Sequence, residues 1–273
     1  MPIPPYAEPA LPHLDDLGGD LLTTTAWQCR VSCARPFVGI AAFAFASWLG
    51  WWWLTPMIVF LIFVAVVTVT HDVVHGALGL TARQTEWALF AFGAVLLESG
   101  HAYRVTHLQH HRVFPAPDDP EGDPARLTFW RAVLWGPVFL PRLWWWAFRQ
   151  RRSRPVERRW LLLEAAWAFL VPLVGLALWP LTPAVLVYAG LVVVGSWVYP
   201  LLTVYLPHCG FGDTPLTQTG TLRGRIIPAL FLELTYHLEH HLYPAVPSHH
   251  LAELSKRLEP TLLAAGVRPT RVP

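Results

Sequence analysis

The stretch MIVFLIFVAVVTVTHDVVH, residues 57–75, joins a long apolar run to a pair of histidines. No charged residue interrupts the run from Met57 to Thr70, and a helix that crosses a bilayer needs about 20 mainly apolar residues. His71 and His75 then stand four positions apart, so a helix presents both imidazoles on one face. The stretch therefore predicts a membrane-spanning helix whose end carries two candidate metal ligands.

Composition extends this interpretation to the whole chain. Hydrophobic residues make up 54% of the sequence and charged residues 14%, whereas soluble domains carry roughly 25% charged residues. Short uncharged turns at residues 54–56 and 180–183 would join the spans into two hairpins. The predicted spans are about Phe37–Trp53, Met57–His71, Trp160–Trp179 and Ala184–Leu206.

Two further segments are predicted to lie in the membrane interface. Thr85–Leu97 is short for a span, and Phe129–Phe148 mixes tryptophans with arginines and prolines. The arginine-rich run Arg149–Arg159 faces the cytoplasm by the positive-inside rule, and the two uncharged turns face outward. The predicted fold class is an all-α integral membrane protein with four transmembrane helices, interfacial helices and a cytoplasmic cap.

We expect three regions: a cytoplasmic N-terminal arm at 1–34, a membrane domain at 35–255 and a C-terminal tail at 256–273. The N-terminus lacks a basic segment followed by an apolar one, so no signal peptide is expected. The net charge of +2 is too small to indicate nucleic-acid binding. Cys29, Cys33 and Cys209 form no paired framework, and we interpret them as ordinary thiols.

Eight of the histidines fall into three clusters with helical spacing: His71 and His75; His107, His110 and His111; His237, His240 and His241. Neutral imidazole is a good ligand for iron, zinc and copper, and this number exceeds what one metal ion takes. If Thr85–Leu97 does not cross the membrane, the topology brings all three clusters to the cytoplasmic face. The pattern therefore predicts a centre with two metal ions.

The wider context of the clusters resembles the membrane fatty acid desaturase and hydroxylase superfamily over about residues 70–251. The stretches HLQHHRVFPAPDDPEGDP (107–124) and YHLEHHLYPAVPSHHL (236–251) are similar to its second and third histidine boxes. The resemblance implies two iron ions held by eight or nine histidines, with O₂ as co-substrate. His208, after the fourth span, is the ninth candidate, and four histidines are expected not to be ligands: His13, His101, His249 and His250.

Carboxylates are expected behind the ligands, because metal-bound imidazoles usually donate their other N–H to an acceptor. Asp72, Asp123 and Glu239 are the candidates, since they lie inside or just after the boxes. Glu164, near the start of the third span, is an ionisable group within a span and so a functional candidate; the alternative is that its side chain simply reaches the interface. We predict no catalytic side chain beyond the metal centre.

The resemblance implies an oxidoreductase that attacks an unactivated C–H bond of a long-chain lipid, chemistry that requires a cofactor. The HHLYPAVP context of the third box favours fatty acid (acyl-lipid or acyl-thioester) desaturation. The alternative is a carotenoid ring hydroxylase or ketolase, favoured by the short chain and the element Tyr205-Leu206-Pro207-His208. The sequence leaves open the substrate and the choice between desaturation and hydroxylation.

Electrons must come from outside the chain, because it contains no iron–sulfur or haem-attachment motif. A separate ferredoxin- or cytochrome-type donor is therefore implied, docking near Arg149–Arg159 unless that run binds anionic lipid. A metal transporter is disfavoured, since the clusters stand at span ends rather than mid-membrane. A zinc hydrolase is disfavoured because catalytic zinc takes about three protein ligands.

Overall fold

The computed structural model describes residues 11–273, and its regular structure is almost entirely helical. Four helical segments are long and apolar enough to cross a membrane, which confirms the prediction of an all-α integral membrane protein: Ala26–Trp48, Trp52–Val74, Pro155–Leu178 and Ala184–His208. The described chain forms two compact units, one of residues 24–210 and one of residues 11–23 with 211–273.

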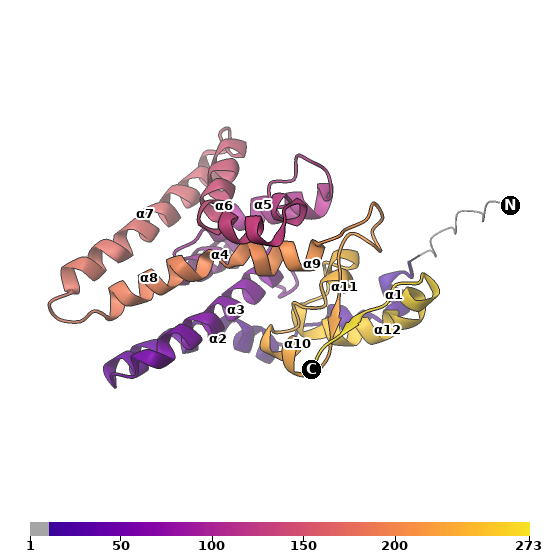
Figure 1. Cartoon of the computed structure of the whole chain (residues 1–273), viewed down its shortest axis with the longest axis horizontal. Coiled ribbons are helices and arrows are strands. Elements are labelled where there is room, and N and C mark those ends of the chain that lie inside the picture. Colours follow the sequence, from indigo (N-terminus) through magenta and orange to yellow (C-terminus); the bar gives the residue numbers. More distant parts are fainter. Residues whose placement is uncertain (1–10) are drawn as a thin grey trace. The chain divides into compact units, whose positions relative to one another are not determined.

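The first hairpin of the larger unit consists of α2 (Ala26–Trp48) and α3 (Thr55–Val74), which run side by side (Figure 1). α2 begins well before the predicted Phe37 because Thr25 and Gln28 form a capping box at its start. A 3₁₀ turn, Trp52–Leu54, leads into α3. α3 ends just before His75, where the positive φ of Gly76 (71°) redirects the chain.

The second hairpin pairs α7 (Pro155–Leu178) with α8 (Ala184–Ser196). Beyond α8 the chain passes through a π-helix, Leu201–Tyr205, and ends in the short helix α9 (Leu206–His208). π-helical turns are rare and frequently occur at functional sites. The widened turn sets the direction in which His208 leaves the fourth span.

Three other helices complete the larger unit: α4 (Ala82–Val95), α5 (Gly100–Val113) and α6 (Phe129–Gln150). A 3₁₀ turn, Asp123–Arg126, precedes α6. None of the three is among the candidate spans of the described chain, in line with the interfacial positions predicted for α4 and α6. α6 exposes Trp130 and Trp145 and buries Phe139 and Leu143, as expected of a helix lying at an interface.

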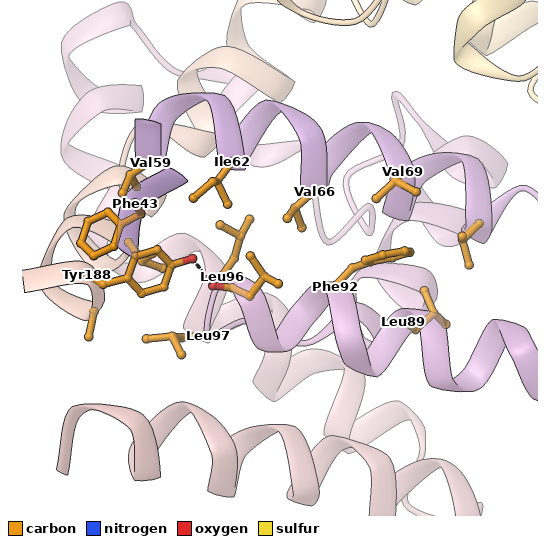
Figure 2. Close-up of a cluster of buried hydrophobic side chains, with 14 of the residues drawn as sticks. Phe43, Val59, Ile62, Val66, Val69, Leu89, Phe92, Leu96, Leu97 and Tyr188 are labelled. Carbon is orange, nitrogen blue, oxygen red and sulfur yellow. Dashed lines mark hydrogen bonds between the residues drawn. The ribbon is translucent and has the colours of Figure 1, made fainter. Parts of the chain in front are cut away.

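An apolar core fixes α4 against α3 and α8 (Figure 2). Ile62, Val66 and Val69 of α3 contribute to it, with Leu89 and Phe92 of α4. The Tyr188 hydroxyl of α8 donates a 2.7 Å hydrogen bond to the carbonyl of Val95, the last residue of α4. α4 and the α5 helix that follows it are thereby held beside the end of α3, where His71 lies.

The smaller unit contains the C-terminal part of the chain and the described N-terminal residues. Its core is formed largely by leucines of α12 together with Leu21 and Leu238, and Arg257 forms a two-pronged ion pair with Asp20. β1 and β2 pair in parallel. Its elements are α1 (Leu14–Leu17), the 3₁₀ turn Gly19–Leu22, β1 (Leu222–Arg223), α10 (Ile226–Leu230), α11 (His237–Leu242), the 3₁₀ turn Ser248–His250, α12 (Leu251–Ala264) and β2 (Thr270–Arg271).

The close approach of α4 and α5 yields a first prediction. A Cβ on Gly100 would stand 2.3 Å from the Leu89 carbonyl oxygen, so Gly100→Ala must push the two helices apart. We expect a loss of about 1–3 kcal/mol of unfolding free energy, the usual range for overpacking. Thermal unfolding in detergent measures it, with Gly190→Ala as control because a Cβ there meets nothing within 4 Å. Equal unfolding temperatures for the two variants would contradict this packing.

Candidate metal centre

Four imidazoles from two helices converge in the larger unit. His71 and His75 stand at the end of α3, and His107 and His111 project from α5. One ring nitrogen of each lies within 4.8 Å of the corresponding atoms of the others. The His107 and His111 Nε2 atoms are 3.2 Å apart. As the i, i+4 spacing predicts, the two imidazoles of each pair lie on one face of their helix. Both pairs face the same point.

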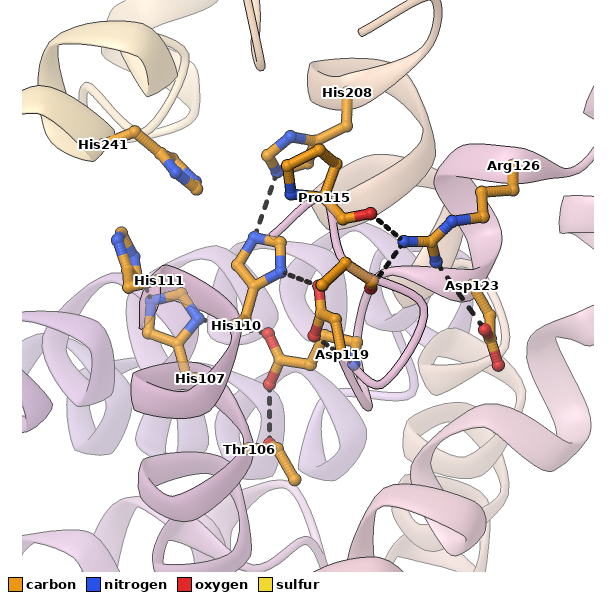
Figure 3. A network of polar contacts seen from close by, with 12 residues as sticks. Thr106, His107, His110, His111, Pro115, Asp119, Asp123, Arg126, His208 and His241 are labelled. Carbon is orange, nitrogen blue, oxygen red and sulfur yellow. Dashed lines mark hydrogen bonds and ion pairs between the residues drawn. The ribbon is translucent and has the colours of Figure 1, made fainter. Parts of the chain in front are cut away.

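A second group lies beside the first. His110 of α5 and His208 of α9 direct their Nε2 atoms toward each other at 3.3 Å (Figure 3). His110 points away from its neighbour His111, because consecutive helical residues differ by about 100° in direction. α5 therefore serves two separate groups of imidazoles, which is the arrangement needed for two metal ions.

The nitrogen spacings suit a metal ion. A metal–nitrogen bond is about 2.0–2.1 Å long, so two nitrogens bound to one ion at an ordinary angle are about 3.0–3.4 Å apart. The pairs His107–His111 and His110–His208, at 3.2 and 3.3 Å, fall in that range. The donor set of these groups is entirely imidazole nitrogen, which suits iron as well as zinc and copper.

Two carboxylates stand behind the second cluster (Figure 3). Asp119 Oδ2 lies 2.7 Å from His110 Nδ1, and Glu121 Oε2 lies 3.2 Å from His107 Nδ1. Thr106 donates a 2.6 Å hydrogen bond to the other oxygen of Glu121. With Nδ1–H donated to the carboxylate, the lone pair of each ring is at Nε2, which is the atom directed at a neighbouring imidazole.

Burial favours the neutral form of three of these imidazoles by lowering their pKa. It lowers the pKa of His75 to about 3, helped by the nearby His71, and it lowers the pKa of His107 and His111 as well. Neutral imidazole is the form that binds metal. Burial also raises the pKa of Glu121 to about 7. His75, His107 and His111 are thus held in the protonation state that metal binding requires.

The third cluster lies on α11 of the smaller unit. Its outer members, His237 and His241, bring their Nε2 atoms to 3.1 Å, and His240 is buried. Glu239, fully buried, accepts hydrogen bonds from Arg223 of β1 and Ser255 of α12. Glu239 therefore fixes α11 within its own unit.

The carboxylates that were predicted to lie behind the ligands have different surroundings in the structure. Asp72 Oδ1 is 3.7 Å from His71 Nδ1, beyond hydrogen-bond distance. Asp123 forms ion pairs with Arg126 and Arg142. The carboxylates in hydrogen-bond contact with His110 and His107 are Asp119 and Glu121, which the sequence reasoning missed. Their signal was the acidic stretch that follows the second cluster, although spacing alone does not distinguish its members.

The remaining histidines have other surroundings. His101 is bound by two carboxylates of the larger unit, and His250 Nε2 lies 3.0 Å from the Thr23 carbonyl. Within the described part of the chain, no group of donors able to hold a metal includes any of the four histidines expected not to be ligands: His13, His101, His249 and His250.

Comparisons with known proteins agree with this geometry. Residues 46–272 match the model of the family described as fatty acid desaturase. The chain is 29% identical to a beta-carotene ketolase of Paracoccus sp. (strain N81106 / MBIC 01143), covering 87% of this chain and 93% of that protein. It is 26% identical to a beta-carotene ketolase of Paracoccus sp. (strain PC1), covering 82% and 81%. It is 27% identical to the dihydrorhizobitoxine desaturase of Bradyrhizobium elkanii, covering 78% and 70%.

The contact between His110 and Asp119 gives a second prediction. Asp119→Ala removes the acceptor of the His110 Nδ1 proton and should weaken metal binding about 10- to 100-fold, as such changes generally do. Iron retained by detergent-purified protein during exposure to a chelator measures the effect. Asp123→Ala is the matched control, because its ion pairs are with arginines. Iron loss at the same rate from both variants would contradict the role assigned to Asp119.

Proposed function

Because the chain belongs to the fatty acid desaturase family and is therefore a non-haem di-iron oxidoreductase, we propose that it oxidises a ring methylene of a carotenoid to a ketone. The observation that carries this proposal is the similarity to two beta-carotene ketolases, each covered over most of its length. The support is stronger for this reaction, the alternative from sequence, than for the fatty acid desaturation favoured by the third-box context. No fatty acid desaturase stands among the named relatives above.

Desaturation is the second candidate, and it has a specific observation in its favour. One relative is named as a desaturase of dihydrorhizobitoxine. Removal of a second hydrogen atom and transfer of oxygen to carbon begin with the same attack on a C–H bond. Whether desaturation or oxygen transfer follows depends on how the substrate is held. Membership of the family therefore supports both reactions.

We propose nine histidines as the iron ligands. The four-imidazole group of α3 and α5 and the pair formed by His110 and His208 would serve different ions. Asp119 and Glu121 would orient the rings, beside the candidates expected from sequence, which were Asp72, Asp123 and Glu239. The proposed ligands are His71, His75, His107, His110, His111, His208, His237, His240 and His241.

When bound, the two irons together with O₂ supply an oxidant able to attack an alkyl C–H bond, which side chains alone cannot do. The protein supplies a dry place for the substrate. An apolar pocket in the larger unit is lined by residues of α3, α4, α5 and α6, among them Phe63, Gly93 and Trp144. Its wall includes Thr70 and Thr106, which directly precede His71 and His107. A hydrocarbon group in this pocket would lie beside the first two histidine clusters.

Tyr103 forms part of the boundary between the pocket and the metal-binding group. Its ring stacks on His107 at 4.7 Å between centroids, and the same residue lines the pocket. An aromatic ring in this position can pack against an unsaturated hydrocarbon end group.

The family implies an external electron donor, and the distribution of arginines indicates how the chain is oriented in the membrane. Family membership implies an external donor and a lipid-like substrate. We propose that the donor meets the cytoplasmic face, because the arginine-rich segment 149–159, where α6 ends and α7 begins, faces the cytoplasm by the positive-inside rule. Within that segment, Arg151 and Arg154 pair with Glu157. The other arginines of the run, among them Arg149 and Arg152, are candidates for donor or lipid contact.

Expression in two hosts tests the substrate. In a host that makes β-carotene, we expect new keto-carotenoids and unchanged fatty acids; in a host with simple fatty acids and no carotenoid, we expect no new lipid. Chromatography with mass spectrometry of total lipids is the measurement. New acyl double bonds with unchanged carotenoids would overturn the ketolase proposal in favour of desaturation.

A variant that lacks one proposed iron ligand is tested in the same lipid analysis. His110→Ala removes an imidazole whose Nε2 faces His208 and should abolish product formation while the protein still inserts into the membrane. Immunodetection in washed membranes checks insertion, and His250→Ala provides a histidine control outside the groups able to hold a metal. Full activity of His110→Ala would refute its assignment as a ligand.

A further inference from the structure

A buried polar network lies in the larger unit, outside the histidine groups that could hold metal. At its centre is His101 of α5, which is 2% exposed. Its Nδ1 lies 2.8 Å from Glu164 Oε1 on α7, and its Nε2 lies 3.1 Å from Glu86 Oε2 on α4. Arg104 also donates to Glu86, at 2.6 Å. Three helices thus meet at one imidazole.

The protonation of His101 follows from its partners. An ionised carboxylate only accepts hydrogen bonds, so with both carboxylates ionised the ring carries a proton on each nitrogen. The ring lies flat against Trp160, with 4.9 Å between centroids and 9° between planes, a position that favours a cation over an aromatic face. The two carboxylates are then balanced by the positive charges of His101 and Arg104. His101 is therefore able to receive a proton at one nitrogen and release one at the other.

The network extends from a partly exposed end to the apolar pocket. The Glu86 side chain is 32% exposed, whereas Glu164 is 2% exposed and lies within a candidate span. Ser99 donates a hydrogen bond to the second oxygen of Glu164. Ser99 also lines the pocket whose wall includes Thr70 and Thr106. Four exchangeable groups in continuous hydrogen-bond contact thus join the accessible edge of α4 to the proposed substrate pocket.

Ionisable groups inside membrane spans are costly and commonly mark proton or substrate pathways. Glu164 has the features of such a group, since one of its carboxylate oxygens is hydrogen-bonded to His101 and the other to Ser99. A purely mechanical link between α5 and α7 would need no partly exposed acid at one end and no pocket at the other.

We propose that Glu86, His101, Glu164 and Ser99 form a proton path that supplies the O₂-dependent reaction of this protein. This proposal rests on the proposed function. When one C–H bond is converted to C–OH, the O–O bond of O₂ breaks and one oxygen leaves as water. Two of the electrons that reduce O₂ come from the C–H bond and two from the external one-electron donor protein. The two protons that balance the donor's electrons enter through the path.

Glu164→Gln tests the path with little change of shape. It removes the ionisable group and keeps hydrogen-bonding capacity toward Ser99 and His101. We expect at least a tenfold lower kcat with unchanged KM and iron content, and more peroxide released per O₂ consumed. The control is Glu253→Gln, a partly exposed acid of α12 that pairs with Lys256 and Arg257 outside the proposed path and the arginine-rich run. It should behave as wild type.

Infrared spectroscopy tests the proton path without measuring turnover. In the metal-free protein, infrared spectra should show histidine N–H and carboxyl signals that exchange readily with D₂O and respond to Glu86→Gln. Glu86→Gln alters the partly exposed end, so it keeps the test informative if Glu164→Gln fails to insert. Wild-type kcat, coupling and exchange in both variants, with only a lower unfolding temperature, would show a structural role and overturn the proposal. Absence of any product from the wild type would instead refute the proposed function.

Discussion

Imidazole nitrogens whose lone pairs face one another at close range impose the main physical constraint on the larger unit. Asp119 and Glu121 bind the Nδ1 side of His110 and His107, which leaves the Nε2 atoms of both rings directed at other imidazoles. Buried nitrogens at such spacings repel unless a proton or a cation lies between them. Burial lowers the pKa of His107 and His111 and so disfavours additional protons, which leaves a metal ion as the natural partner.

The helices around these rings serve to fix their positions. Gly93 and Gly100 let α4 and α5 approach until backbone meets backbone, and a Cβ at either position would clash. α4 is in turn held against α3 and α8 by the apolar core and by the Tyr188 hydrogen bond. Both helices that carry the first two clusters are therefore tied to the spans, so the positions of the ligands depend on the packing within the membrane.

Much of this could be read from the sequence because the signals are local. Apolar runs gave the four spans, and i, i+3, i+4 spacing predicted which histidines share a face. The start of α2 was placed too late, although Thr25 and Gln28 already indicated the cap. The assignment of residues 1–34 and 256–273 as arm and tail stays a prediction; residues 1–10 of that arm lie outside the described part of the chain.

Contacts between distant segments could not be read in the same way. Asp119 and Glu121 reach their histidines only because the loop after α5 folds back over the helix. The candidates expected from sequence were Asp72, Asp123 and Glu239. His101 looked unremarkable in sequence, since its partner Glu164 lies 63 residues away and on another helix. The choice of substrate likewise depends on the shape of the pocket rather than on the histidine motifs shared by the family.

The number and kind of metal ions test the central claim most directly. Iron analysis and Mössbauer spectroscopy of the purified, iron-loaded protein should give two iron ions per chain that are magnetically coupled. One iron per chain, two uncoupled irons, or zinc retained in preference to iron would contradict the account of two neighbouring histidine groups that serve one oxidative centre.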